Sequence, residues 1–169
     1  MFIEILGAVR TAQEWSQRAP RYQGEFVFGP ESPEKIVFGV FGDSVGCGLG
    51  VPSVERTFAG SVARRLAVRR RVVCRISAFS GARGRGLALQ PPAGDERFAA
   101  ISIGTNDIIH GESLSGLENA VLRFPHARHF GPNDLKIPFA PSHYALDGFH
   151  PNESAHAMIA DAALDRLIA

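Results

Sequence analysis

The segment IVFGVFGDS, residues Ile36 to Ser44, is the part of the sequence that most clearly indicates a fold. Its first six residues, Ile36–Phe41, form a continuous apolar run, which is typical of a strand buried on both faces, as in a parallel sheet. The run ends abruptly in the small and polar residues Gly42, Asp43 and Ser44. The segment therefore predicts an interior strand that delivers polar side chains to one edge of a sheet.

A helix is predicted directly after this strand. In the segment Val54–Ala67, the apolar residues Phe58, Val62 and Leu66 recur at intervals of four, which is the spacing of one helix face. Ser53 precedes the segment, and serine is a favoured N-cap because its hydroxyl accepts a free backbone N–H of the first turn.

The alternation of strand and helix continues to the end of the chain. Two further apolar runs, Val72–Ala78 and Phe98–Ile103, predict a second and a third strand. A final helix is predicted over Glu153–Ile168, with Asn152 as its cap. Such an alternation is typical of an α/β domain with a parallel sheet, whose right-handed crossovers place helices on both faces.

The remaining segments carry weaker signals. A short helix is predicted from about Phe2 to Trp15, and a surface loop from Arg18 to Lys35, which is rich in Pro, Gly and Glu. Leu114–Leu122 carries another helical face, and Ala127–Phe130 is a weak strand. We find no internal repeat, so residues 1–169 are predicted to form one domain, with 1–35 as an N-terminal helix and lead-in loop.

Composition places the chain among ordinary globular proteins. It has 169 residues, of which 45% are hydrophobic and 21% are charged, and its formal net charge is +1. This charge argues against nucleic acid or an anionic membrane as a partner. Two cysteines do not predict a disulfide framework. The apolar N-terminus is short and interrupted by Glu4, so it does not resemble a signal peptide, which favours a cytoplasmic over a secreted protein. No apolar run is long enough to span a bilayer.

Small and polar residues follow each predicted strand and precede the last helix. In open α/β sheets, ligands bind beyond the carboxyl ends of the strands. The segments at these positions are Gly42–Ser44, Ser80–Ala82, Gly104–Asp107 and Asp147–Asn152. We expect all four to converge on one edge of the sheet.

These segments contain the groups that acyl transfer needs. A serine hydroxyl is a poor nucleophile unless a neighbouring base accepts its proton, and His150 is suited to be that base for Ser44. Asp147, three residues earlier, is close enough to orient the imidazole of His150 and stabilise its charged form. The backbone N–H groups of Ser44 and Gly81 and the side-chain amide of Asn106 are suitable oxyanion donors.

The four segments resemble the sequence blocks of the GDSL/SGNH hydrolases, and they appear in the same order. Gly42–Ser44 matches the first block, Gly81 the second, Gly104–Asp107 the third and Asp147–Pro151 the last. The resemblance implies a flavodoxin-like three-layer α/β/α sandwich that needs no metal or organic cofactor. It also implies that Ser44 is the nucleophile, His150 the base and Asp147 the partner of that base. The oxyanion hole would consist of the Ser44 amide, Gly81 and Asn106.

The chain departs from the family pattern at two points. Val45 replaces the leucine of the first block, which the family tolerates. In addition, only 40 positions separate Asp107 from Asp147, where such enzymes usually carry a further helix–strand–helix stretch. The loss of one strand–helix unit would lower one wall of the substrate cleft and favour short acyl groups. The apolar surface left exposed would also favour formation of a homo-oligomer.

Three other interpretations stay open from the sequence. Gly42–Gly46 fits the G-x-S-x-G nucleophile elbow of α/β-hydrolases, although Ser44 follows the first strand rather than a later one. The glycines of Gly46–Gly50 could instead hold a pyrophosphate in a dinucleotide-binding domain, although their spacing is not G-x-G-x-x-G. The chain could also be an inactive structural or interaction module with an SGNH fold.

The interpretation that accounts for most residues is a serine ester hydrolase acting on a small-molecule ester. It implies an acyl-serine intermediate, without a cofactor and without a metal site. The remaining histidines show no metal-ligand spacing; they are His110, His126, His129, His143 and His156.

Overall fold

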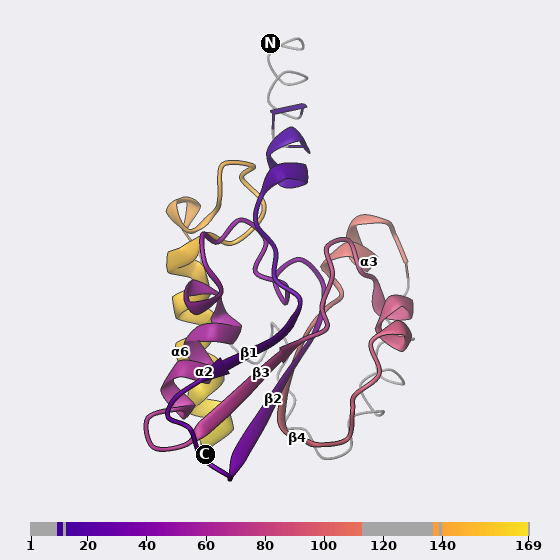
Figure 1. Ribbon diagram of the computed structural model, residues 1–169. Helices are drawn as coiled ribbons and strands as arrows, with labels where there is room; N and C mark the ends of the chain where they lie inside the picture. Colours follow the sequence, from indigo (N-terminus) through magenta and orange to yellow (C-terminus); the bar gives the residue numbers. More distant parts are fainter. Residues whose placement is uncertain (1–9, 12, 113–136, 139, 169) are drawn as a thin grey trace.

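A computed structural model of the chain describes residues 10–11, 13–112, 137–138 and 140–168. Its centre is a four-stranded sheet with the strand order β1-β3-β2-β4. Figure 1 shows helices α2 and α6 side by side against one face of this sheet, with the residues that connect β3 to β4 and helix α3 on the other side.

The three predicted strands form the parallel part of the sheet, and their prediction is confirmed. The central strand β2 (Lys35–Gly42) is buried at every position except Lys35. It pairs in parallel with β3 (Arg71–Ile76) on one side and with β4 (Glu96–Ser102) on the other. A strand with neighbours on both sides and cover on both faces cannot alternate apolar and polar residues, which explains its continuous apolar sequence.

Strand β1 (Gly24–Phe28) corrects the prediction of a loop over residues 18–35. It pairs antiparallel with β3 at the edge of the sheet, which is therefore mixed rather than parallel throughout. Phe26 and Phe28 pack against the core, whereas Val27 between them is exposed. This alternation is the signal of a half-buried strand, and the surrounding proline and glycine residues obscured it.

The predicted helix over 54–67 is divided in two. A 3-10 turn, η1 (Val54–Arg56), precedes helix α2 (Phe58–Leu66). The N-cap of α2 is Thr57, whose side chain accepts the Gly60 N–H at 3.0 Å, and Ser53 forms no side-chain capping bond, so its prediction as the cap was wrong.

Helix α6 (Glu153–Ile168) forms with the predicted bounds. Asn152 Oδ1 accepts the N–H groups of Ser154 and Ala155 at 3.1 and 3.2 Å, which confirms Asn152 as the cap. Helices α2 and α6 cover the main hydrophobic core, to which the sheet contributes Phe38, Val40 and other buried side chains. The core therefore fixes the two helices against the face of β2 and β3.

A second, smaller core lies on the other face of the sheet. There Phe41, Ala99 and Ile101 pack against Ala82 and against Leu87 of the 3-10 helix η2 (Gly84–Leu89). Both faces of the sheet are thus covered, and the predicted α/β class is confirmed. The described residues also form helix α3 (Thr105–Ile109) and the turn η3 (Pro141–His143).

Some predictions fall wholly or partly outside the described residues. The helical face at 114–122, the weak strand at 127–130 and the missing strand–helix unit are among them. Of the N-terminal helix predicted over 2–15, residues 10–11 and 13–15 are described and are helical, and the helix continues to residue 18. Within the described ranges, no helix combines the length and apolar character needed to cross a bilayer.

Candidate active site

Ser44 lies two residues beyond the end of β2, in a turn that contacts with Ser102 and Gln90 hold in place. Gly42 has a φ of +121°, and a Cβ there would clash with the Ser102 carbonyl of β4. The buried Gln90 side chain extends the strand end, because its Oε1 accepts the Gly42 N–H at 2.6 Å and its Nε2 donates to the Gly42 carbonyl at 3.0 Å. Only glycine fits at position 42, because any side chain there would collide with the Ser102 carbonyl.

Asp43 shapes the same turn from inside the protein. Its Oδ1 accepts the Val45 N–H at 3.0 Å and the Ser102 hydroxyl at 3.2 Å. Its side chain is buried, and burial raises the pKa of Asp43 to about 6, against the opposing effects of these hydrogen bonds and of His150. Asp43 is therefore a structural carboxyl that lies within electrostatic range of the predicted base.

Asp147 and His150 form the pair that the sequence predicts. His150 Nδ1 lies 2.5 Å from Asp147 Oδ2, and Asp147 Oδ1 accepts the backbone N–H groups of Phe149 and His150 at 3.0 Å each. Burial alone would raise the pKa of Asp147, but the hydrogen bonds from His150 and Phe149 outweigh it and lower that pKa. Asp147 is thus held ionised, with three donors that fix its orientation.

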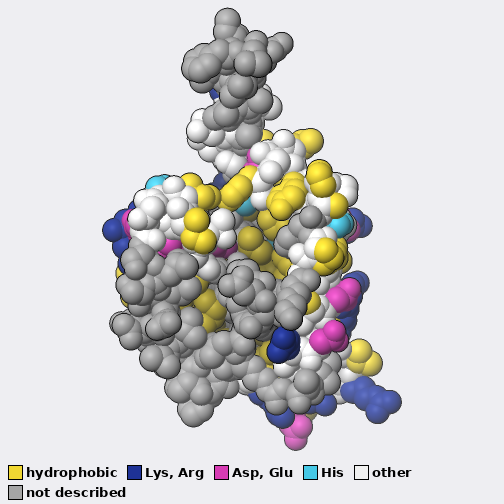
Figure 2. Space-filling view, turned by 180° about the vertical axis from the view of Figure 1, so that it is seen from behind, with side chains coloured by type: hydrophobic (Ala, Val, Ile, Leu, Met, Phe, Trp, Pro, Cys, Tyr) yellow, Lys and Arg dark blue, Asp and Glu magenta, His cyan; other side chains and the backbone are white. Residues whose placement is uncertain are grey.

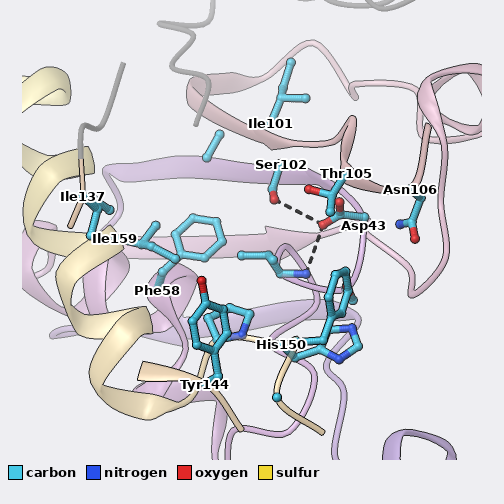
Figure 3. Close-up of a pocket in the computed structure, with 16 residues that line it drawn as sticks. Asp43, Phe58, Ile101, Ser102, Thr105, Asn106, Ile137, Tyr144, His150 and Ile159 are labelled. Atoms are coloured by element: carbon cyan, nitrogen blue, oxygen red, sulfur yellow. Dashed lines mark hydrogen bonds between the residues drawn. The ribbon is translucent and has the colours of Figure 1, made fainter. Parts of the chain in front are cut away.

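A cavity of about 530 Å³ lies next to this pair. Its polar end contains Ser44, Asn106 and His150, and its apolar end contains Phe58 of α2 and Ile159 of α6. Figure 3 shows Ile137, Ile159 and Phe58 on one side of the cavity, and Asp43, Asn106 and His150 on the other. Pockets of this size, mostly apolar with a few polar groups, are typical of small-molecule sites.

The structure brings Ser44 and His150 to the same cavity without joining them. Both residues are within the described part of the chain, and no hydrogen bond links their side chains there. Catalytic hydrogen bonds are often long in unliganded enzymes and shorten when the substrate binds. The structure therefore places Ser44 and His150 at one cavity and pairs His150 with Asp147, and the catalytic roles of the three residues stay predictions.

The three predicted oxyanion donors differ in how they are engaged. Among the described residues, the backbone N–H groups of Ser44 and Gly81 have no hydrogen-bond acceptor. Gly81 has a φ of +80° and does not line the cavity. Asn106 lines it, and its Nδ2 donates to the Ala82 carbonyl at 3.0 Å, which leaves the second N–H of the amide available.

Helix α3 fixes the loop that carries Gly81. Besides the bond from Asn106 to Ala82, both carboxylate oxygens of Asp107 accept the Gly84 N–H, at 2.9 and 3.0 Å. Asp107 is buried. The third block of the sequence, through Asn106 and Asp107, therefore holds the loop of the second block in place.

We predict that replacing Asn106 by alanine lowers kcat by about 10² to 10³, with a smaller change in KM, because one oxyanion donor is worth about that factor. The measurement is steady-state hydrolysis of p-nitrophenyl acetate. Asp161→Asn is the control, since Asp161 is an exposed residue of α6 that pairs with Arg65 away from the cavity. A large rise in KM at constant kcat would instead mean that Asn106 binds the substrate in its ground state.

Cys47 is not a competing nucleophile. Its thiol donates to the Ser44 carbonyl at 3.4 Å, and burial raises the pKa of Cys47 to about 11. Both Cys47 and Cys74 are buried free thiols. A buried thiol with a raised pKa holds too little thiolate to react at neutral pH.

Sequence reasoning missed three residues that shape the site, namely Gln90, Ser102 and Trp15. Gln90 follows a 3-10 helix and precedes two prolines, where nothing indicates a buried side chain. Ser102 is the last residue of β4, and a polar residue at a strand end is only a weak indication of a site residue. Trp15, in the N-terminal helix, lies beside the His150 ring. The two residues are far apart in the sequence, so only the folded structure shows that they are neighbours.

Comparison with known proteins identifies the fold. No protein-family model and no curated protein matches the sequence. Among solved structures, TesA superposes with a TM-score of 0.61 at 17% identity, covering 78% of this chain and 97% of TesA. A lipolytic protein of the G-D-S-L family from Desulfitobacterium hafniense DCB-2 superposes with a TM-score of 0.58 at 10% identity, covering 78% and 98%.

An acetylxylan esterase from Geobacillus stearothermophilus, Axe2, is also similar. It superposes with a TM-score of 0.55 at 19% identity, covering 82% of this chain and 95% of Axe2. The chain thus has the α/β fold of the GDSL/SGNH hydrolases, as the sequence blocks predicted.

Proposed function

We propose that this protein hydrolyses carboxylic esters through an acyl-serine intermediate on Ser44. The observation that carries the proposal is the Asp147–His150 pair at the rim of a cavity that Ser44 also lines. The fold supports it, because the esterases and lipolytic proteins named above share that fold. The substrate is a small-molecule ester, and no step requires a metal or an organic cofactor.

The Asp147–His150 geometry determines which nitrogen acts as the base. With Nδ1 protonated and donating to ionised Asp147, Nε2 of His150 is the acceptor. Nε2 takes the proton of Ser44 Oγ as Oγ bonds to the ester carbonyl carbon. The negative charge on the carbonyl oxygen is stabilised by the Ser44 N–H and the Asn106 amide, which line the cavity, with the Gly81 N–H as the third predicted donor from the adjoining loop.

The same groups complete the reaction. The tetrahedral intermediate expels the alcohol, which takes the proton held by His150, and the acyl group stays on Ser44 Oγ. A water molecule then gives a proton to His150 Nε2 and attacks the acyl carbon, and the carboxylic acid leaves as Ser44 recovers its proton. The test is hydrolysis of p-nitrophenyl acetate by the wild-type protein, with Ser44→Ala as the blank. No hydrolysis of any ester would favour the inactive-module interpretation.

We further propose that the preferred acyl group is short, about two to four carbons. The short stretch between Asp107 and Asp147 favours this, and Phe58, Ile137 and Ile159 lie at the apolar end of the cavity, where they would limit the chain (Figure 3). Burial of a methylene is worth about 0.8 kcal/mol, or about fourfold in kcat/KM.

We predict that kcat/KM for p-nitrophenyl esters rises about fourfold per methylene up to about four carbons and then levels off. Ile137→Ala should extend the rise to longer chains, because it shortens a half-buried side chain at the apolar end. The series is run on protein of known oligomeric state, since a partner subunit could add a wall. A steady rise through eight or ten carbons in a demonstrated monomer would contradict the proposed preference.

A further inference from the structure

The N-terminal segment is bound to the loop that follows Ser44. The Tyr22 N–H donates to the Cys47 carbonyl at 2.8 Å, and the Gly50 N–H donates to the Pro20 carbonyl at 2.9 Å. The Tyr22 hydroxyl also donates to the Val51 carbonyl at 3.0 Å. In Figure 1 the N-terminal helix projects from the end of the sheet at which β2, β3 and β4 terminate. The segment and the candidate active site therefore share one end of the molecule.

Trp15 extends this attachment to the predicted base. Its indole lies on the backbone of Gly50, which has a φ of +85° and where a Cβ would clash with the ring. The centroid of the indole lies 6.4 Å from that of the His150 imidazole, with the two planes 39° apart. Trp15 is half-buried and packs against the main core. One side chain thus touches the loop that follows Ser44 and lies beside His150.

We propose that Trp15 is a positioning residue that holds the imidazole of His150 in the orientation needed to accept the Ser44 proton. The inference rests on the proposed hydrolase function. The His150 ring has Asp147 at Nδ1 and Phe149 in an edge contact, with centroids 4.9 Å apart. Trp15 adds a contact from outside the loop that carries His150, so it resists a movement of that whole loop away from Ser44.

The size of the effect follows from how steeply catalysis depends on geometry. A misplacement of about 1 Å can cost a factor of about 10² in rate. Asp147 and Phe149 move together with His150, because all three lie within four residues of one another. Trp15 instead connects His150 to residue 50, in the loop that follows Ser44. Its loss should therefore separate base and nucleophile while leaving the Asp147–His150 hydrogen bond intact.

The first experiment measures the contact without relying on activity. Trp15 is the one tryptophan of the chain, and a protonated imidazole beside an indole quenches its fluorescence more strongly than a neutral one. The groups that face His150 are Asp147, Asp43 and His156. Burial lowers the pKa of His156 to about 3, so it stays neutral at the pH values of interest.

We expect the emission of the wild-type protein to fall as the pH is lowered. The fall should be smaller in His150→Asn, and any part that remains should vanish when Asp43→Asn is added, because Asp43, with a raised pKa of about 6, is the other group near His150 that changes charge in this range. An equal fall in the wild-type protein and in His150→Asn, or an emission that does not change in the wild type, would overturn the inference.

The second experiment separates positioning from binding. Trp15→Ala should lower kcat about 10- to 100-fold and leave KM for p-nitrophenyl acetate within about twofold. Trp15→Phe, which keeps a ring against Gly50, should recover most of the loss. Val68→Ala, at an exposed site after α2, should behave as wild type.

The outcomes separate the two proposals. If the wild-type protein hydrolyses no ester, the proposed function fails. If it is active and Trp15→Ala keeps the wild-type kcat, or raises KM at constant kcat, the positioning role of Trp15 is wrong. An equal loss of kcat in Trp15→Phe and Trp15→Ala would also contradict it, because Phe retains the packing against residue 50.

Discussion

Replacing Ser44 by alanine should lower kcat for ester hydrolysis by about 10³ to 10⁶, the range seen when a member of a catalytic triad is removed. The hydroxyl is the group to which the acyl chain becomes bonded, so no other side chain at the site can replace it. The measurement is p-nitrophenyl acetate turnover by purified protein, together with a thermal unfolding curve to show that the variant is folded.

The matched control is Ser32→Ala. Ser32 is a serine in the turn between β1 and β2, at the opposite end of β2 from Ser44. This variant should retain wild-type activity. Because Ser44 is 6% exposed and sits beside a tightly held turn, a small change in unfolding temperature is expected for Ser44→Ala. Wild-type activity in that variant would exclude an acyl-Ser44 intermediate.

Asp147→Asn should have the second largest effect, a loss of about 10⁴ in kcat, as when the carboxylate of a Ser-His-Asp triad becomes an amide. An asparagine at this position can present its N–H₂ group to Nδ1, which favours the tautomer with the proton on Nε2. That tautomer cannot accept the Ser44 proton. The loss would then come from the wrong tautomer, while the ring stays in place.

The pH profile gives this prediction a second readout. Hydrogen bonds from His150 and Phe149 lower the pKa of Asp147, so the carboxyl is ionised throughout the neutral range and favours the protonated imidazole. A base must be neutral to accept the Ser44 proton, so the wild-type kcat/KM should fall as the pH is lowered. Asp147→Asn removes the negative charge that favours the protonated base, so the fall should then begin at a lower pH.

The control for this prediction is Asp161→Asn. Asp161 is an exposed carboxyl that pairs with Arg65 between α6 and α2, away from the cavity. It should change neither the rate nor the pH at which the fall begins. A rate profile that is flat from acid to neutral pH in the wild-type protein would argue against a histidine base altogether.

The central strands and the last helix could be predicted because each has a strong local pattern. Strand β2 is apolar throughout since both of its faces are covered, and α6 begins at an asparagine that caps it. Strand β1 has the right alternation, but the glycine and proline residues around it resemble a loop. Helix α2 starts after Thr57, whose side chain accepts the Gly60 N–H, and the apolar spacing that predicts the helix does not show which of the preceding residues caps it.

The predicted site residues could be chosen because each follows a strand or precedes the last helix. Parallel strands bring such positions to one edge without any further information. Gln90, Ser102 and Trp15 could not be chosen in this way. Gln90 bonds to Gly42 across 48 positions and Ser102 to Asp43 across 59. Their roles depend on how the segments pack, and that of Trp15 depends on where the N-terminal helix meets Gly50 and His150.

The most direct test of Ser44 as an activated nucleophile is covalent labelling with a serine-directed phosphonylating reagent, followed by peptide mass mapping. Reaction at phosphorus requires a serine whose proton is accepted by a neighbouring base. We predict one adduct per chain, located on Ser44, absent in Ser44→Ala and formed much more slowly in His150→Ala. An adduct on another residue, or equal labelling of the wild-type and Ser44→Ala proteins, would contradict the account.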